Sequence, residues 1–572
     1  MTGADAPVTR RPGPLSDFTL TPRVLVIVAW ALPVGALGAG AAWLLLRLIG
    51  VITQAVFAGR ASSEVANPGT LGAPWWVLLG APVLGGLVVG LMARYGSEAI
   101  RGHGMPEAIE AILFRRSIVA PRVAVLKPTS AAVSIGTGGP FGAEGPIIMT
   151  GGAIGSVLAQ RLTVTDDERK ALMVAGAAAG MAATFNAPLA SVLLAVELLL
   201  FEWRPRSFLP VAAAVVVATL LRGPMLGYEP IFEVDTAGWH VGLPAELLCV
   251  VTGALGGLLA VVVTRLVYAS EDGFAALGRR TGLHWMWWPA IGGLIIGIGG
   301  LIVPRALGVG YDVIGDLLSG RAALSLVVGI LVVKSLIWGL SLGSGTSGGV
   351  LAPTFMIGAA LGALAGFVLP AVGPGFWAVV GLAATVGGVL RSPLTGVVFT
   401  LELTHAWPAL LPLLIASASA YGLSVLLLGR SVLTEKIARR GRHLSREYGV
   451  DPLETRFVDE AMADAPMVLA PGEEVPDDAP GRQRLFPLVD DGRLVGVVLR
   501  TSRAVVDDPV VVGPDDTLVV ARDRLLAAGV TAAPVVGPDR ELLGLVTLEG
   551  LFGQPGTGQP ASPANASAAG IT

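Results

Sequence analysis

The sequence has little charge and a single cysteine. Charged residues make up 14% of its 572 residues and hydrophobic residues 53%, and the mean hydropathy is +0.72. Because soluble globular proteins carry roughly 25% charged residues, this composition argues against a wholly water-soluble protein. The lone Cys249 excludes an internal disulfide and a multi-cysteine metal site.

Histidine is scarce as well. The five histidines are scattered, with no pair at the spacing of metal ligands, so no metal site is predicted. No run of Lys and Arg with interleaved aromatic residues is present, which argues against nucleic acid as a partner.

The few charges are unevenly distributed. Residues 451–550 contain 9 basic and 19 acidic side chains, whereas residues 1–450 contain 30 basic and 23 acidic ones. The overall charge of −3 therefore averages two different bodies. We expect the long apolar body to lie in lipid and the short acidic body in water.

Long uncharged segments predict membrane helices, because about 20 mostly apolar residues cross a bilayer. Three segments meet that length: residues 24–46, 285–304 and 403–429. The polar residues 1–23 before them do not resemble an ordinary signal peptide, so the first membrane helix is predicted to begin at Val24.

Other apolar segments are broken or short. Residues 335–390 run for 56 positions without a charge but are interrupted by Gly and Pro, and residues 207–221 and 188–196 are predicted to be too short to cross at right angles. Helices that end inside a membrane require protein or a hydrophilic cavity around the freed backbone groups. This pattern is typical of a transporter or channel.

The apolar body contains an internal repeat. Residues 134–155 align with 341–362 at an offset of 207, and residues 186–198 align with 391–403 at an offset of 205. Two blocks in the same order at nearly equal offsets indicate one duplication. Two halves that face a shared midplane site are the usual arrangement in transporters.

Basic residues indicate the orientation. They cluster at three places: Arg10 and Arg11; Arg115, Arg116, Arg122 and Lys127; and residues 436–442. By the positive-inside rule these ends face the cytoplasm. The prediction is a multi-pass cell-membrane protein with both termini inside.

The C-terminal region has a different pattern. Residues 486–500 resemble residues 533–549, each predicting a strand, a polar turn and a second strand, and residues 516–530 predict a helix before the second copy only. The predicted domains follow: an N-terminal segment (1–23), a transmembrane domain (24–442, with halves at about 24–222 and 243–430), a linker (443–455), a tandem α/β domain with an abbreviated first copy (456–552) and a disordered tail (553–572).

Three segments place glycines just before a proline at the start of an apolar run: GHGMP (102–106), GAEGP (142–146) and GVLAP (349–353). Proline is favoured at the first helical position, and glycine lets the preceding backbone turn sharply and approach a ligand. Each motif therefore predicts a helix N-terminus with free N–H groups directed into the protein, which forms an anion site without a full positive charge.

These motifs, in this order and spacing, resemble the signatures of the CLC chloride channel and transporter family, and residues 456–552 resemble its C-terminal pair of CBS modules. The resemblance covers about residues 24–552. It implies an all-α polytopic membrane protein built from an inverted repeat of tilted and broken helices, with a small α/β CBS domain. It also implies a homodimer in the lipid bilayer with one anion pathway in each subunit. The anion-binding positions it implies are Gly102, His103, Gly104, Met105, Pro106, Gly142, Gly145, Pro146, Gly349, Val350, Leu351 and Leu433.

Glu144 corresponds to the gating glutamate of the family. Its repeat partner is Leu351, so the helix start itself does not require an acid. A carboxylate at a helix N-terminus mimics an anion: ionised, it occupies the anion position, and protonated or displaced, it opens the path. The alternative is a simple capping acid. The family usually has Lys or Arg where this chain has Ala143.

Two coordinating positions depart from the family. His103 stands where chloride-transporting members usually have serine, and its ring is expected either to donate to the anion, with a pH dependence set by a pKa near 6.5, or to point aside. Leu433 stands where the family usually has tyrosine. Weaker central anion binding is the expectation.

A third departure concerns protons. Exchangers of the family often carry two adjacent acids late in the helix that begins at the NAPLA segment (186–190). Here Glu197 is followed by Leu198 instead. If the helix continues, Glu202 shares a face with residue 198 and is a candidate internal proton acceptor. The alternative is an interfacial Glu202 paired with Arg204 or Arg206. Glu197 and its repeat partner Glu402 are predicted to cap or pair near helix ends.

The predicted function is chloride or small-anion transport gated by Glu144, with proton exchange favoured over a passive voltage- or pH-gated channel. No cofactor is predicted, because the CBS copies lack the usual Asp of a nucleotide site, with Gly550 and Ser502 in its place. The segment 345–349 also fits G-x-S-x-G, so an intramembrane serine protease using Ser347 is a remote alternative. That chemistry requires a histidine beside the serine. We therefore expect no enzyme.

Overall fold

The computed structural model describes residues 22–441, 453, 456–463, 466–476, 479 and 483–551. These residues form two compact units, one within residues 18–446 and one within residues 447–572. The predicted linker and tail lie almost entirely outside the described residues, as do Arg10 and Arg11.

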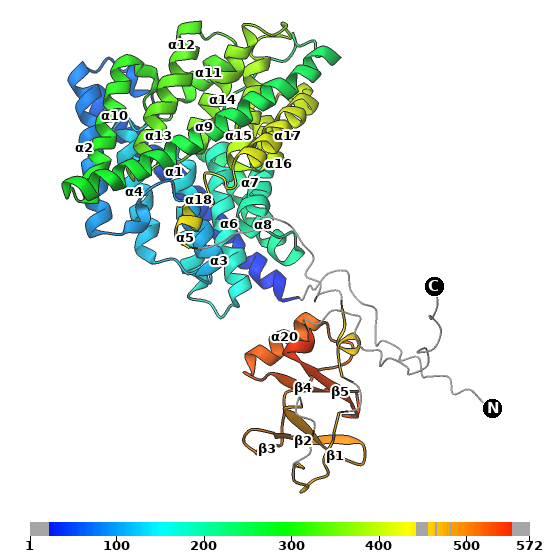
Figure 1. The fold of residues 1–572 in the computed structure, drawn as a ribbon. Helices are drawn as coiled ribbons and strands as arrows, with labels where there is room; N and C mark the ends of the chain where they lie inside the picture. Colours follow the sequence, from blue (N-terminus) through cyan, green and yellow to red (C-terminus); the bar gives the residue numbers. More distant parts are fainter. Residues whose placement is uncertain are drawn as a thin grey trace, which may run out of the picture. The chain divides into compact units, whose positions relative to one another are not determined.

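The larger unit is helical throughout (Figure 1). The helices of its first half are α1 (Arg23–Ala58), α2 (Trp75–Tyr95), α3 (Met105–Phe114), α4 (Pro121–Gly136), α5 (Glu144–Ala159), α6 (Asp166–Phe185), α7 (Pro188–Leu194) with a π-helical turn η3 (Ala195–Leu200), and α8 (Pro205–Leu226). The helices of its second half are α9 (Leu243–Thr281), α10 (Trp288–Ile302), α11 (Tyr311–Leu318), α12 (Leu324–Gly329) with a π-helical turn η6 (Ile330–Lys334), α13 (Ser335–Gly343), α14 (Leu351–Gly366), α15 (Phe376–Leu390), α16 (Pro393–Thr404), α17 (Leu410–Leu427) and α18 (Glu435–Arg439).

Seven helical runs within the described residues are long and apolar enough to cross a membrane. They include α1, Trp285–Ile302 and Trp407–Leu427, which confirms the three predicted spans. The uncharged residues 335–390 divide into α13, α14 and α15, and Pro188–Leu200 stays short, as the Gly and Pro breaks predict.

The prediction for residues 207–221 was wrong. Helix α8 has 22 residues, because it extends from Pro205, at its N-terminal turn, past Arg222. The Arg222 side chain turns into the protein and donates to the carbonyls of Ala183 and Gly227. Its charge therefore does not end the helix, and α8 is long enough to cross a membrane.

The ends of the helices repeat between the halves. Helix α6 ends at Asn186 and α15 at Arg391, both in the left-handed conformation, and Phe201 and His405 end the following helices in the same way. Residues other than glycine adopt this conformation uncommonly. Its recurrence at offsets of 205 and 204 supports the duplication read from the sequence.

The smaller unit contains two antiparallel hairpins. Strands β1 (Leu485–Asp490) and β2 (Arg493–Leu499) pair with each other, β3 (Val505–Val506) adds to β2, and β4 (Ala532–Val536) pairs with β5 (Leu542–Thr547). Helix α20 (Leu518–Ala527) precedes β4, and α21 (Leu548–Leu551) follows β5. The predicted strands and the helix at 516–530 are confirmed. Both hairpins also carry a register shift at the same place, at Leu488/Val489 and Val535/Val536.

Candidate functional site

The three glycine–proline motifs each begin a helix, as predicted. Helices α3, α5 and α14 start at Met105, Glu144 and Leu351, one or two residues before the proline. None of the three has a side-chain N-cap hydrogen bond. The N-cap residues themselves therefore leave the first N–H groups of these helices without a side-chain acceptor.

The loops before these helices meet at one point. Gly142 and Gly349 form an antiparallel bridge in which Gly349 N–H donates to the Gly142 carbonyl over 2.7 Å. Gly102 forms a parallel bridge with Ser347. A Cβ on Gly145 would overlap the His103 carbonyl. The structure thus brings together three motifs that are up to 250 residues apart in the chain.

The Glu144 side chain lies between the two bridged glycines. It is fully buried, and its Oε1 accepts the Ala352 N–H at 3.1 Å. Its Oε2 has no hydrogen-bond partner among the described residues. A Cβ on Gly142 or Gly349 would overlap this oxygen. The carboxylate therefore occupies space that exists because both positions are glycine, at the N-terminus of α14.

His103 is buried, 3% exposed, and its Nδ1 has no partner among the described residues. The backbone on either side of it is in the left-handed conformation, with φ of 77° at Gly102 and 82° at Gly104. Met105, Pro106 and Pro146 are also buried, so these positions shape the wall around the helix starts.

The segment that ends with α18 packs beside α3. Leu433 is fully buried, and the Lys436 Nζ lies 2.8 Å from where a Gly102 Cβ would stand. The hydroxyl of Tyr268, from α9, donates to the Val432 carbonyl. The sequence did not point to this tyrosine. Leu433 provides no hydroxyl, and the nearby Tyr268 hydroxyl comes from α9 and donates to a backbone carbonyl.

Lys127 corrects a sequence prediction. It was counted with the cytoplasmic basic residues, but its side chain is fully buried. Its Nζ donates to the carbonyls of Ile100 (2.8 Å) and Gly102 (2.7 Å) and to Ser347 Oγ (3.2 Å). An ammonium has three donors, so none is left for an anion. Lys127 instead holds the chain before α3 in its turn.

The comparisons with known proteins agree with this geometry. The family model described as voltage gated chloride channel matches residues 85–425, more than half of the chain, and a CBS domain model matches residues 503–553. The chain belongs to the voltage-gated chloride channel family.

Relatives and solved structures support this assignment. A putative chloride channel protein ClcB-like of Ralstonia nicotianae is 30% identical over 61% of this chain and 82% of its own length. An H(+)/Cl(-) exchange transporter ClcA of Vibrio campbellii is 31% identical over 61% and 76%. The structure of a slow cyanobacterial Cl-/H+ antiporter superposes with a TM-score of 0.63 at 25% identity, covering 74% of this chain and 99% of that one. A eukaryotic CLC transporter gives a TM-score of 0.60 at 22% identity, covering 92% and 98%.

In this voltage-gated chloride channel fold, two glutamates link the repeat halves. Glu402 accepts the N–H groups of Leu189 and Ala190 at 2.9 and 2.8 Å, at the start of α7. Glu197 accepts the N–H and hydroxyl of Thr395 at 3.0 and 2.5 Å, at the start of α16. Each glutamate caps a helix of the other half, which confirms the predicted capping role.

The helix that contains Glu197 does not continue to Glu202, although the predicted role of Glu202 as proton acceptor required it. The helix that carries Glu197 ends at Phe201, whose φ is 56°, so Glu202 does not share a helical face with residue 198. Glu202 lies 3.6 Å from Lys170 and 3.6 Å from Arg204, and it accepts the Ser207 hydroxyl at 2.6 Å. Arg206 pairs with Asp167 instead. The paired alternative therefore describes its contacts.

A fourth helix start escaped sequence reasoning. Gly308-Val309-Gly310 precedes α11 with left-handed glycines at 308 and 310. The buried Lys334 donates to the carbonyls of Ala306 (2.8 Å) and Gly308 (2.7 Å). These contacts reproduce those of Lys127 before α3, at offsets of 206 and 207. The repeat could have predicted this helix start, because Lys127 and Lys334 are 207 residues apart, the same offset as in the first repeat block.

The structure gives Ser347 no catalytic surroundings. Its hydroxyl is buried and contacts Lys127 and Ser130, at 3.2 and 3.0 Å. No histidine is a hydrogen-bond partner of Ser347 within the described part of the chain. A lysine already donating to two carbonyls is no general base. Membership of the chloride channel family makes the chain a transport protein rather than an enzyme.

Proposed function

We propose that this chain exchanges chloride for protons across a membrane, along a path gated by Glu144. The observation that carries the proposal is the position of its carboxylate, which fills the space between Gly142 and Gly349 and accepts an N–H from the first turn of α14. Backbone N–H groups at a helix N-terminus bind anions. The carboxylate therefore stands where a chloride ion would bind.

The surroundings favour reversible binding. The buried Lys127 directs its three donors elsewhere, and Lys436 pairs with Glu107 at 2.9 Å. The anion would then contact backbone N–H groups at the helix N-termini, which carry only partial positive charge, so it is bound without a full positive charge beside it. A carboxylate that moves aside or takes a proton frees its position for chloride, which couples the two ions at one site.

Exchange is supported by the relatives that are named H(+)/Cl(-) exchange transporters and antiporters. Passive conduction is the second candidate. It is favoured by Leu198 and by the helix end at Phe201, which leave no second acid on the face of the helix that carries Glu197.

Reconstituted liposomes distinguish the two. With a chloride gradient and no proton gradient, chloride efflux and external pH are recorded together. Exchange predicts proton movement driven by the chloride gradient, which Glu144→Ala abolishes. Gly40→Ala in α1 keeps it, because no atom lies within 4 Å of the Gly40 Cβ position. Chloride efflux without proton movement in the unmodified protein contradicts exchange and supports passive conduction.

Glu202 is tested in the same assay. If Glu202→Gln abolishes proton movement and leaves chloride efflux intact, Glu202 is the internal proton acceptor. If both fluxes continue, its role is the ion pairing with Lys170 and Arg204.

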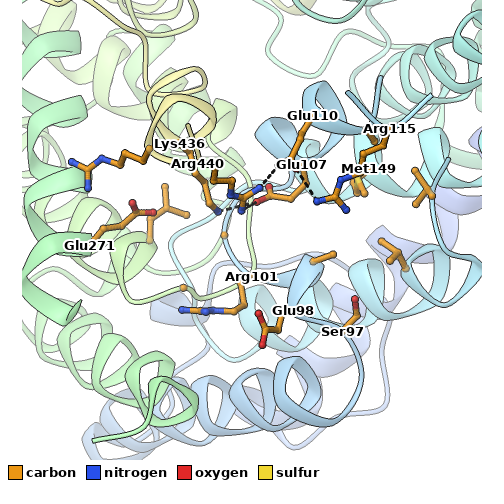
Figure 2. A pocket seen from close by; sticks show the side chains of 18 of the residues that line it. Ser97, Glu98, Arg101, Glu107, Glu110, Arg115, Met149, Glu271, Lys436 and Arg440 are labelled. Carbon is orange, nitrogen blue, oxygen red and sulfur yellow. Dashed lines mark hydrogen bonds and ion pairs between the residues drawn. The ribbon is translucent and has the colours of Figure 1, made fainter. Parts of the chain in front are cut away.

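We also propose a homodimer oriented with the cavity of Figure 2 toward the cytoplasm. Arg115, Arg122, Arg439 and Arg440 line that cavity, and the positive-inside rule places such residues at the cytoplasmic face. The N- and C-termini and the CBS domain are then cytoplasmic. We propose no nucleotide ligand, since the hydroxyl of Thr547, at the end of β5, already accepts the N–H of Gly550 in α21. A tandem CBS arrangement stays a prediction, because the family model covers the second copy alone.

A further inference from the structure

Arg101 is a cation whose donors are unused. Its guanidinium carbon lies 4.4 Å from the centre of the Trp285 ring and 5.9 Å from that of Trp288. Within the described residues its side chain forms no hydrogen bond or ion pair, and its Nε is buried without a partner. Stacking on aromatic rings fixes the plane of a guanidinium but uses none of its N–H groups.

The Arg101 residue lines a cavity that reaches the turn before α3. The cavity has a volume of about 850 Å³, and Arg101, Gly102 and Gly345 form part of its wall. Gly102 begins the turn before α3. A Cβ on Gly345 would lie 3.0 Å from Arg101 Nε, so the guanidinium also touches the loop that precedes α14. Arg101 therefore stands where the cavity meets two of the three converging loops.

Four of the other cations that line the cavity are already paired (Figure 2), and only Arg122 has no ion pair among the described residues. The pairs are Arg115 with Glu110 at 2.7 Å, Lys436 with Glu107 at 2.9 Å, Arg439 with Asp272 at 2.6 Å, and Arg440 with Glu107 and Glu110. Their charges are compensated by acids of the protein. Glu98 and Glu271 also line the cavity, but neither forms an ion pair with Arg101.

We propose that Arg101 binds the transported anion at the mouth of the pathway and passes it to the start of α3. The ligand is a small monovalent anion, chloride first. At a partly solvated site, water and salt screen the attraction between the guanidinium and the anion, so the anion can leave again, as conduction through successive sites requires. This inference rests on the proposed transport of anions.

The test separates binding from structure. The full chain is reconstituted in liposomes, and the initial rate of radioactive chloride exchange is measured against chloride concentration. Arg101→Gln is expected to raise the half-saturating chloride concentration about fivefold, because a charge-assisted contact is lost at a partly solvated site, with the maximal rate unchanged. Arg101→Lys keeps the charge and recovers most of the affinity.

Arg115→Gln is the matched control. Arg115 lines the same cavity but is already bonded to Glu110, so its loss leaves the half-saturating concentration unchanged. The inference is overturned if Arg101→Gln leaves that concentration unchanged. A second result would also overturn the inference: Arg101→Gln and Arg101→Lys both lower the maximal rate and the thermal stability, but neither changes the half-saturating chloride concentration. Arg101 would then act by packing on tryptophan. If the unmodified protein exchanges no chloride, the proposed function itself fails.

Discussion

The two halves of the membrane unit share a backbone framework and differ in the side chains set into it. Lys127 and Lys334 each bind two carbonyls of the turn before a helix, α3 in the first half and α11 in the second. Glu197 and Glu402 each cap a helix of the opposite half. Figure 1 shows α3 and α11 at opposite ends of the unit, as two halves of opposite direction require.

The repeat does not duplicate the side chains to which we assign a functional role. Glu144 aligns with Leu351, and His103, in the turn before α3, corresponds to Val309 in the turn before α11. Duplication therefore provides paired helix starts, and the proposed gate, Glu144, is a single side chain that only one of them carries. Four predictions test this division, in order of decreasing effect.

The largest effect is expected where the halves touch. Gly142→Ala and Gly349→Ala each add a Cβ that overlaps the Glu144 carboxylate, so the chloride transport rate should change at least about tenfold as the gate is displaced. Chloride efflux from liposomes measures it. Gly40→Ala in α1 is the control, because no atom lies within 4 Å of its Cβ position. Normal flux in both site variants would show that the glycines do not position the gate.

The buried lysines come next. Lys127→Met and Lys334→Met each leave two carbonyls without their donor, and each should lower the free energy of unfolding by about 3 kcal/mol. Denaturation in detergent micelles measures both. If the framework is shared, the two losses agree within about 1 kcal/mol. A loss confined to one lysine would contradict equivalent roles.

Substitution of either capping glutamate should lower the free energy of unfolding less than loss of a buried lysine, and by a similar amount in the two halves. Glu197→Gln and Glu402→Gln each weaken charge-assisted contacts at a helix N-terminus, at a cost of about 1 kcal/mol. Denaturation of the two variants checks this, and proton movement in liposomes should persist in Glu197→Gln. Lost proton movement would make Glu197 part of the proton path.

The smallest effect is expected at Glu202. Its ion pairs with Lys170 and Arg204 are long, 3.6 Å, and partly exposed, so Glu202→Gln should change the free energy of unfolding by less than about 1 kcal/mol. The same denaturation experiment, run beside Glu197→Gln, compares a loose pair with a helix cap. An equal or larger loss at Glu202 would reverse that order.

Local chemistry made much of the fold predictable. A proline lacks an N–H and a glycine accepts a positive φ, so the sequence around residues 106, 146 and 353 predicts the starts of α3, α5 and α14. The apolar spans and the two hairpins follow from hydropathy and alternation in the same way. The length of α8 did not follow, because Arg222 satisfies its charge on the distant carbonyl of Ala183.

The sequence by itself determined the helix starts, the repeat and the acid at position 144, because each depends on neighbouring residues or on a constant offset. The tertiary structure alone decided which basic side chains use their donors in hydrogen bonds to the protein and which do not. Lys127 uses its donors on Ile100, Gly102 and Ser347, residues 25 to 220 positions away, whereas Arg101 rests on Trp285 with its donors unused. Composition shows two basic residues, and three-dimensional contacts alone separate the structural cation from the one that faces the anion's path.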